Sequence, residues 1–440
     1  VDNTLFFVRN RVNGGSALIP PGFGGSITYG PPGGVHTLRS YVHSDEYFDK
    51  HPEYFAYTKE YWFSIGKRIK NGQLCMTNKD VVDIIIKKLK EYIRTSYEKA
   101  DKEGKIRPYM YSITQNDCGR TRSCKCRDCM RFIRNEGQSG LNMMLVNKVA
   151  EAIEKEYPEA KIETLAYWYY NQPPVRIKPH SNVVIMYANN HNDILHSIMH
   201  QNNKKGLEAL KGWLEISDTV FIWDYAVNYE PNPPLPTMYR VMNDYKLFHE
   251  WGVKGIFVEH ERPITSDMWD MKAWLEIKLM ENPDIDINKA IADFTDRYYG
   301  KAGSYIRRYL ERCREDANKA GMHVTFETEF KEYKYFTPEF IVWADRLFDE
   351  ATLFASNDEI LVRRLNHARS SLDRLVVLGC KDLLKQTEQK GINDREIKMI
   401  KEKSEVRLVN TLKTEKEFRT GCQDDGFVIK NKEYQHIIPQ

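Results

Sequence analysis

The sequence predicts an α/β fold, a (β/α)8 barrel that continues into a C-terminal helical bundle. Between residues 1 and 265, apolar segments of strand length alternate with amphipathic helical patterns, and from Ser266 onward only helical patterns follow. Apolar strands that alternate with helices are typical of a parallel sheet covered by helices. The expected domains are therefore a catalytic barrel over residues 1–265, a helical region over 266–425 and a tail over 426–440.

Seven apolar segments are expected to be strands: residues 5–9, 73–76, 109–114, 162–167, 183–188, 220–225 and 255–259. A closed (β/α)8 barrel needs eight strands. We therefore expect the first strand to lie upstream of Val1 or to be missing. An open doubly wound sheet is the alternative, and it is disfavoured because no glycine-rich phosphate-binding turn follows any of these strands.

Helices are expected where apolar residues recur at spacings of three and four. Asn78 is the expected N-cap of a helix that contains residues 81–86, and Gly252 is expected to end a helix over residues 238–251. The other expected helices are 141–156, 268–280, 287–299, 304–320, 338–356, 358–378 and 393–418. The last six of these form the predicted helical region.

The composition is that of an ordinary globular protein, with 41% hydrophobic and 29% charged residues. A net charge of +3 without a long basic run argues against a nucleic-acid partner. No apolar run of about 18 residues is present, so no transmembrane segment is expected. Aromatic residues reach 12%, with 26 Tyr and 8 Trp. These aromatic residues either pack in the core and on the surface, or line a cleft in which their flat faces stack on sugar rings.

Polar and aromatic residues gather where the predicted strands end, which is where barrels of this kind carry their active sites. These residues are Asn116, Asp117, Tyr167, Trp168, Asn189, Trp223, Asp224, Tyr225 and Glu259. Aromatic faces, amides and acids that can protonate a leaving oxygen are typical of a carbohydrate-processing site.

Asp117 and Glu259 can also be explained by structural roles that involve no substrate. Asp117 is compatible with a role as a turn residue before the cysteine loop, or as an ion-pair partner of Arg120 and Arg122. Glu259 is also compatible with an ion pair to Lys254 or Arg262 at a solvated rim.

Two other acids are interpreted from their positions in the strands. Asp224 ends an apolar strand, and an acid there is costly unless it has a role or a partner. Glu163 lies early in its strand, so we expect it to face a helix or the barrel interior rather than the substrate.

Four cysteines follow Asp117, in the order Cys118, Cys124, Cys126 and Cys129. They suit a closed structural zinc site, and equally one or two disulfides in an exported protein. In both interpretations this loop stabilises the strand end that carries Asp117. Four other cysteines, Cys75 among them, have no spacing typical of metal ligands.

Several motifs together resemble one known family. ITQND is followed by CKCRDC, ETLAYWYY, FIWDY, GVKGIFVE and DFTDRYYG. In this order they resemble the domain-of-unknown-function family 4838, over about residues 4–300. That family largely became glycoside hydrolase family 163, whose characterised activity is that of an endo-β-N-acetylglucosaminidase on complex N-glycans. The resemblance implies a (β/α)8 barrel with a helical C-terminal region. It also implies export to the cell envelope of a gut bacterium.

The resemblance also implies a chemistry, because enzymes that cleave β-linked N-acetylglucosamine often use the substrate's own acetamide as the nucleophile. In related barrels the acid and the group that holds the acetamide end the fourth strand. With one strand counted upstream of Val1, the fourth strand ends at Asn116 and Asp117.

The expected roles follow from this placement. Asp117 and Glu259 are the expected catalytic carboxylates, and Asn116 is expected to support the acetamide. The expected substrate-binding residues are Tyr167, Trp168, Trp223, Asp224, Tyr225 and Asn189. No catalytic cofactor is expected, and the substrate is an N-glycan or glycoprotein. The rival interpretations are a glycan-binding barrel without catalysis, and a glycosidase for another hexosaminide or a uronic acid.

Overall fold

The computed structural model of the chain describes residues 27–59, 65–188, 190–226, 228, 233–259, 266–390 and 393–418. The chain forms two compact units that are interleaved in the sequence. Unit 1 comprises Val1–Asn190, Lys205–Asp224 and Phe248–Phe257, and unit 2 comprises His191–Lys204, Tyr225–Leu247 and Val258–Gln440. The domain boundary expected at residue 265 stays a prediction, and the expected tail lies outside the described residues.

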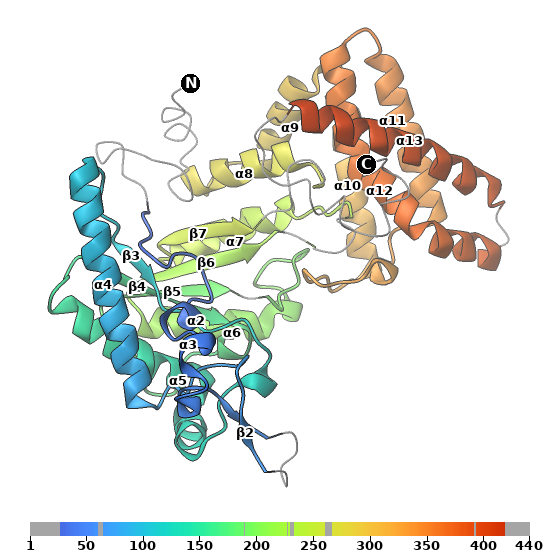
Figure 1. Cartoon of the computed structure of the whole chain (residues 1–440). Helices are drawn as coiled ribbons and strands as arrows, with labels where there is room; N and C mark the ends of the chain where they lie inside the picture. Colours follow the sequence, from blue (N-terminus) through green and yellow to red (C-terminus); the bar gives the residue numbers. More distant parts are fainter. Residues whose placement is uncertain are drawn as a thin grey trace. The chain divides into compact units, whose positions relative to one another are not determined.

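A curled parallel sheet of five strands, in the order β3-β4-β5-β6-β7, forms a half-barrel (Figure 1). Its strands are β3 (Met110–Ser112), β4 (Lys161–Tyr167), β5 (Val183–Ala188), β6 (Val220–Tyr225) and β7 (Gly255–Glu259). The predicted mixed α/β class with parallel strands is confirmed. The closed eight-stranded barrel stays a prediction.

The sequence located these five strands well, because a strand buried on both faces of a parallel sheet is a nearly continuous apolar run. All six residues of β5 are buried. The predicted strand over 5–9 lies outside the described residues. Beside β3, Tyr29 forms a parallel bridge with Met110 that the sequence did not predict.

The predicted strand over residues 73–76 is wrong. Among the described residues, its one sheet-like contact is an isolated antiparallel bridge between Leu74 and Phe55. The two bonds of this bridge run from the Ala56 N–H to the Gln73 carbonyl and from the Cys75 N–H to the Tyr54 carbonyl, and the N–H of Gln73 donates to the carbonyl of Arg122. The apolar character of Leu74 and its neighbours therefore reflects a buried loop. The expected count takes this loop as the third barrel strand, so the described residues do not support the count by which Asn116 and Asp117 end strand four.

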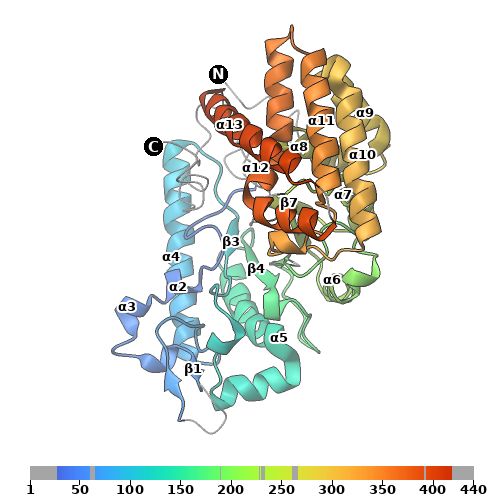
Figure 2. The same cartoon turned by 90° about the vertical axis from the view of Figure 1, so that its right-hand side faces the viewer.

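Two long helices accompany the sheet in unit 1, α4 (Lys79–Glu103) and α5 (Arg127–Glu154) (Figure 2). The predicted N-cap of α4 is confirmed, because the Asn78 side chain accepts from the N–H groups of Asp80 and Val81. Helix α5 packs against α4 and β4. It is interrupted at Gly137, whose φ of 79° is left-handed and suits only glycine without strain.

Besides short 3-10 helices, four α-helices and two short strands complete the described elements before residue 260. They are α2 (Leu38–Tyr41), α3 (Ser44–Tyr47), β1 (Tyr57–Thr58), β2 (Lys67–Arg68), α6 (Lys204–Ile216) and α7 (Met238–Glu250). Strands β1 and β2 pair antiparallel.

The predicted helical region is confirmed as a set of helices in unit 2 (Figures 1 and 2). They are α8 (Trp269–Glu281), α9 (Ile287–Tyr298), α10 (Gly303–Ala320), α11 (Pro338–Phe354), α12 (Glu359–Lys390) and α13 (Arg395–Phe418). Helices α11, α12 and α13 pack against one another. Among the helices that the structure describes, none is long and apolar enough to cross a membrane.

A buried charge network joins α11, α12 and α13. Arg369 on α12 is 1% exposed, and its guanidinium lies 2.7 Å from Asp345 and 3.5 Å from Asp373. Arg407 on α13 reaches the same two carboxylates at 2.8 and 2.7 Å. Each of these two carboxylates therefore faces two guanidinium groups.

Candidate functional site at the carboxyl ends of the strands

The end of β3 delivers Asn116 and Asp117 to different environments. Asn116 is buried, and its Nδ2 donates to the carbonyl of Gly72 at 2.9 Å while its Oδ1 accepts from the N–H of Arg39 at 3.0 Å. Gln73 adds two bonds to the Asn116 backbone, at 2.6 and 3.0 Å. Both ends of the Asn116 side chain are thus occupied by backbone groups, and these contacts favour a role in holding the loop in place.

Asp117 is exposed directly after this fixed residue. Among the described residues, none forms a hydrogen bond or ion pair with its carboxylate. The structure therefore gives no support to the ion pairs with Arg120 and Arg122, or to a capping bond in the turn. The carboxylate is available to solvent and to a ligand.

The end of β4 presents an exposed aromatic residue in an unusual backbone conformation. Trp168 is 38% exposed, and its φ of 54° places it in the left-handed region. A bulky side chain adopts this conformation only at a cost of about 1–3 kcal/mol, and such residues concentrate at binding and catalytic sites. Tyr167 lies beside it, with 6.0 Å between the ring centroids.

The loops that follow β3 and β4 are joined by hydrogen bonds. The Gln73 Nε2 group lies 2.6 Å from the Asn116 carbonyl and 3.3 Å from the Tyr169 hydroxyl. The Tyr169 hydroxyl also donates to the carbonyl of Cys118 at 3.0 Å. The exposed Asp117 and the exposed Trp168 therefore stand on two loops that are fixed to each other.

His36 is a residue of this region that sequence reasoning missed. Its φ of 59° is also left-handed, its Nδ1 lies 2.8 Å from the Gln115 carbonyl, and its ring lies 6.0 Å from that of Tyr167. The buried Oε1 of Gln115 has no hydrogen-bond partner in the described part of the chain. The available sequence signal was the glycine pair before Val35, which indicates a tight turn next to His36 because glycines often occur in such turns.

The ends of the remaining strands hold the other predicted residues. Trp223 on β6 packs against Phe257 with 4.5 Å between ring centroids, and Asp224 is 8% exposed. In unit 2, Tyr225 is buried and stacks on Phe326 at 4.9 Å.

Glu259 ends β7 in unit 2 with a partly exposed side chain, and its carbonyl accepts from the N–H of Ala226 at 3.1 Å. Asn189 lies outside the described residues. The substrate-binding and catalytic roles of all these residues stay predictions.

The family comparison agrees with the motifs along these strand ends. Residues 6–311 match the model of the domain of unknown function DUF4838. The chain belongs to the DUF4838 family. The extent of the match agrees with the resemblance expected over about residues 4–300. No curated protein matches this DUF4838 chain.

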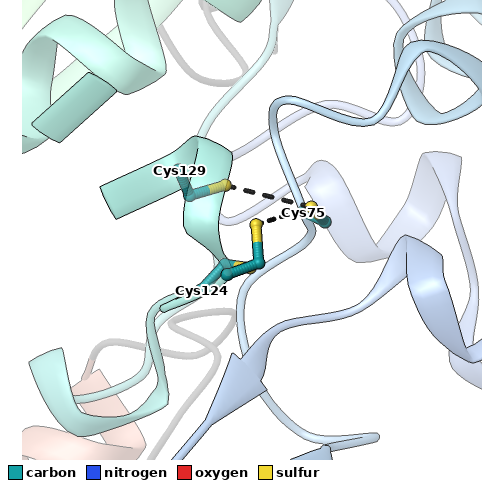
Figure 3. A group of neighbouring side chains, drawn as sticks. Cys75, Cys124 and Cys129 are labelled. Atoms are coloured by element: carbon teal, nitrogen blue, oxygen red, sulfur yellow. Dashed lines mark hydrogen bonds between the residues drawn. The ribbon is translucent and has the colours of Figure 1, made fainter. Parts of the chain in front are cut away.

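The cysteine loop of this DUF4838 protein does not form the predicted four-residue set. The sulfur atoms of Cys124, Cys126 and Cys129 converge with that of Cys75, and all four lie within 4.8 Å of one another. Figure 3 shows three of these side chains close together: Cys75 from the loop before α4, Cys124 from the loop before α5 and Cys129 from the first turn of α5. Cys118 is not a member, so its assignment as a ligand is wrong. The fourth member comes from a distant segment that spacing within one loop could not reveal.

The four sulfur atoms influence one another's protonation. The hydrogen bond with Cys124 is the largest of the effects that lower the pKa of Cys75, to about 6. The corresponding bond with Cys124 raises the pKa of Cys129. None of the described cysteines is in a disulfide.

A buried acid lies beneath the strand ends. Glu163 on β4 is 2% exposed, as expected for an interior residue, and its Oε2 accepts a 2.5 Å hydrogen bond from the Tyr29 hydroxyl. Burial raises the pKa of Glu163 to about 7, although the bond from Tyr29 acts in the opposite direction. The folded protein therefore holds a proton on Glu163 at pH values where the unfolded chain has lost it.

We expect the stability of the protein to decrease between about pH 4.5 and pH 7 because of Glu163. The loss should approach about 3 kcal/mol and level off above the folded pKa. Glu163→Gln should remove this pH dependence, which urea unfolding at about pH 5 and about pH 8 measures. Glu151→Gln, at an exposed position on α5, is the control. An unchanged pH dependence in Glu163→Gln would contradict the assignment.

Proposed function

We propose that this DUF4838 protein is a glycoside hydrolase, an endo-β-N-acetylglucosaminidase that cleaves the chitobiose core of complex N-glycans. The observation that carries this proposal is the placement of Asp117 and Trp168 on two loops that hydrogen bonds join to each other. An exposed carboxylate without a partner in the described chain stands on a loop that is hydrogen-bonded to the loop of an exposed, left-handed tryptophan. A carboxyl group that can protonate the leaving oxygen and an aromatic face that can pack on a sugar ring are both typical of glycosidase sites.

The proposed reaction uses the acetamide of the substrate as the nucleophile. The acetamide oxygen attacks the anomeric carbon, and a carboxylic acid gives its proton to the departing glycosidic oxygen. A water molecule then opens the cyclic intermediate and returns a proton to the same carboxylate. Asp117 and Glu259 are the proposed carboxylates, and no cofactor takes part in these steps.

The binding surface follows from the same chemistry. Tyr167, Trp168 and Trp223 supply flat faces that suit the apolar side of a sugar ring. Asp224 and Tyr225 are proposed to hold the N-acetyl group. Asn116 fixes the loop from which Asp117 projects, through its bonds with Gly72 and Arg39. The substrate implies that the protein acts outside the cytoplasm, at the cell surface or in the periplasm.

Incubation with a glycoprotein that carries complex biantennary N-glycans tests the proposal. We expect a released glycan that lacks one N-acetylglucosamine, and a protein that retains that sugar, both measured by mass spectrometry. Release of single terminal sugars would instead show an exo-acting glycosidase. Retention on a glycan column without any product would show a binding protein. Either outcome contradicts the endo cleavage proposed here.

A further inference from the structure

The cluster of Cys75, Cys124, Cys126 and Cys129 has no part in the proposed reaction. It joins two segments of unit 1 that are far apart in the sequence, since Cys75 and Cys126 are 51 residues apart. Cys75, Cys124 and Cys129 are each at most 4% exposed, and Cys126 is partly exposed. Four thiols in contact with one another require an explanation beyond apolar packing.

The distances between the sulfur atoms fit a single metal ion. Cys75 Sγ lies 3.7 Å from Cys126 Sγ and 3.9 Å from Cys129 Sγ. A tetrahedral zinc ion with Zn–S bonds of about 2.3 Å holds its sulfur ligands about 3.8 Å apart. Sulfur atoms in a disulfide are only about 2.05 Å apart. The four thiols are therefore spaced as the ligands of one ion and not as bonded pairs.

The surroundings of the sulfur atoms supply hydrogen-bond donors. The backbone N–H of Tyr57 donates to Cys124 Sγ at 3.4 Å, and Arg68 Nη1 lies 3.9 Å from the same atom. The Thr77 hydroxyl lies 3.2 Å from Cys129 Sγ. Donors around the sulfur atoms stabilise thiolates, and thiolates are the form that binds metal. The Arg68 charge also offsets part of the negative charge of a zinc ion with four thiolates.

We propose that Cys75, Cys124, Cys126 and Cys129 bind one Zn²⁺ in a closed structural site. Four protein ligands complete the tetrahedral coordination and leave no position for a catalytic water. The ion fastens the loop before α4 to the start of α5.

The proposed site also stabilises the end of β3. Gln73 lies two residues before Cys75, and its side chain holds the backbone of Asn116 through two hydrogen bonds. Fixing Cys75 therefore limits the movement of Gln73 and of the loop that carries Asp117. Loss of the ion should increase amide hydrogen exchange at residues 71–77 and 113–118.

The test compares cysteine variants of the full chain produced with zinc in the medium. We expect one equivalent of zinc in the wild type by elemental analysis. Cys75→Ser and Cys129→Ser should lose most of the zinc and melt at a lower temperature. Cys118→Ser is the matched control, because Cys118 lies in the same loop and outside the cluster, and it should keep a full equivalent. This measurement does not use hydrolysis, so its outcome is independent of the proposed activity.

Two further measurements keep the proposal testable if a variant fails to fold. Cobalt exchanged into the wild type should give the absorption bands of a tetrahedral tetrathiolate site. The intact mass of the unreduced protein should show no loss of hydrogen from disulfide formation. A disulfide that involves Cys75, zinc retained in Cys75→Ser, or zinc lost in Cys118→Ser would overturn the proposal. Iron in place of zinc would overturn the choice of ion.

Discussion

Asp117→Asn and Glu259→Gln should each reduce glycan release by about 10²–10⁴-fold, the range typical of a lost general acid or base. Both changes keep the size of the side chain, remove its charge and its titration, and replace one acceptor oxygen with an NH2 donor. At Asp117 no hydrogen bond or ion pair with another described residue is lost, so the folded structure should persist. Mass-spectrometric rates of product formation measure the effect, and unfolding temperatures verify that the variants fold.

Matched controls separate catalysis from a general change of charge. Asp83→Asn on α4 and Glu250→Gln on α7 make the same chemical changes at exposed positions, both in unit 1. We expect both controls to keep wild-type rates. Wild-type rates in Asp117→Asn would exclude Asp117 from the reaction, and an α-configured product formed by either carboxylate variant with azide would replace the acetamide mechanism with an enzymic nucleophile.

Asp373→Ala should destabilise unit 2 by about 3–5 kcal/mol, the usual cost of breaking a buried ion pair from one side. Asp373 is 1% exposed and accepts from Ser404 at 2.9 Å and from Arg407 at 2.7 Å. Its removal leaves the charges of Arg407 and the buried Arg369 insufficiently compensated. The free energy of urea unfolding, followed by a probe in the helices of unit 2, measures the loss.

Asp382→Ala is the control for this change. Asp382 lies on the same helix and pairs with Lys385 at 3.2 Å, but its side chain is 45% exposed. Exposed ion pairs contribute about 0–1 kcal/mol, so this variant should remain near the wild type. Equal losses in the two variants would contradict the special role of the buried network.

The strands could be predicted from the sequence because burial on both faces makes each one an apolar run. The same rule failed at residues 73–76, where Leu74 and Met76 are buried in a loop rather than a sheet. The spacing of apolar residues does not distinguish a short strand from a buried loop, because the difference lies in the backbone partners. Those partners, such as Arg122 for Gln73, come from distant parts of the chain.

The sequence likewise predicts some residues of the candidate site and misses others. Asp117 and Trp168 follow strands that the sequence identified and Glu259 is the last residue of one, so their positions at strand ends could be predicted. Cys75 could not be recognised as a member of the thiol cluster, because ligand spacing reports only on neighbours within one segment. His36 was missed because its significance comes from a left-handed backbone and from contacts with residues far away in the sequence.

The interleaving of the two units has a consequence for how the protein is made. Asp193 belongs to unit 2, and it accepts a hydrogen bond at 3.3 Å from the N–H of Val324, which lies 131 residues later. A ribosome adds about 5–20 residues per second, so the segment around Asp193 waits on the order of ten seconds for its partner. Folding during synthesis therefore cannot complete one unit before the other begins, and His191–Lys204 is a segment that a chaperone could bind in the interval.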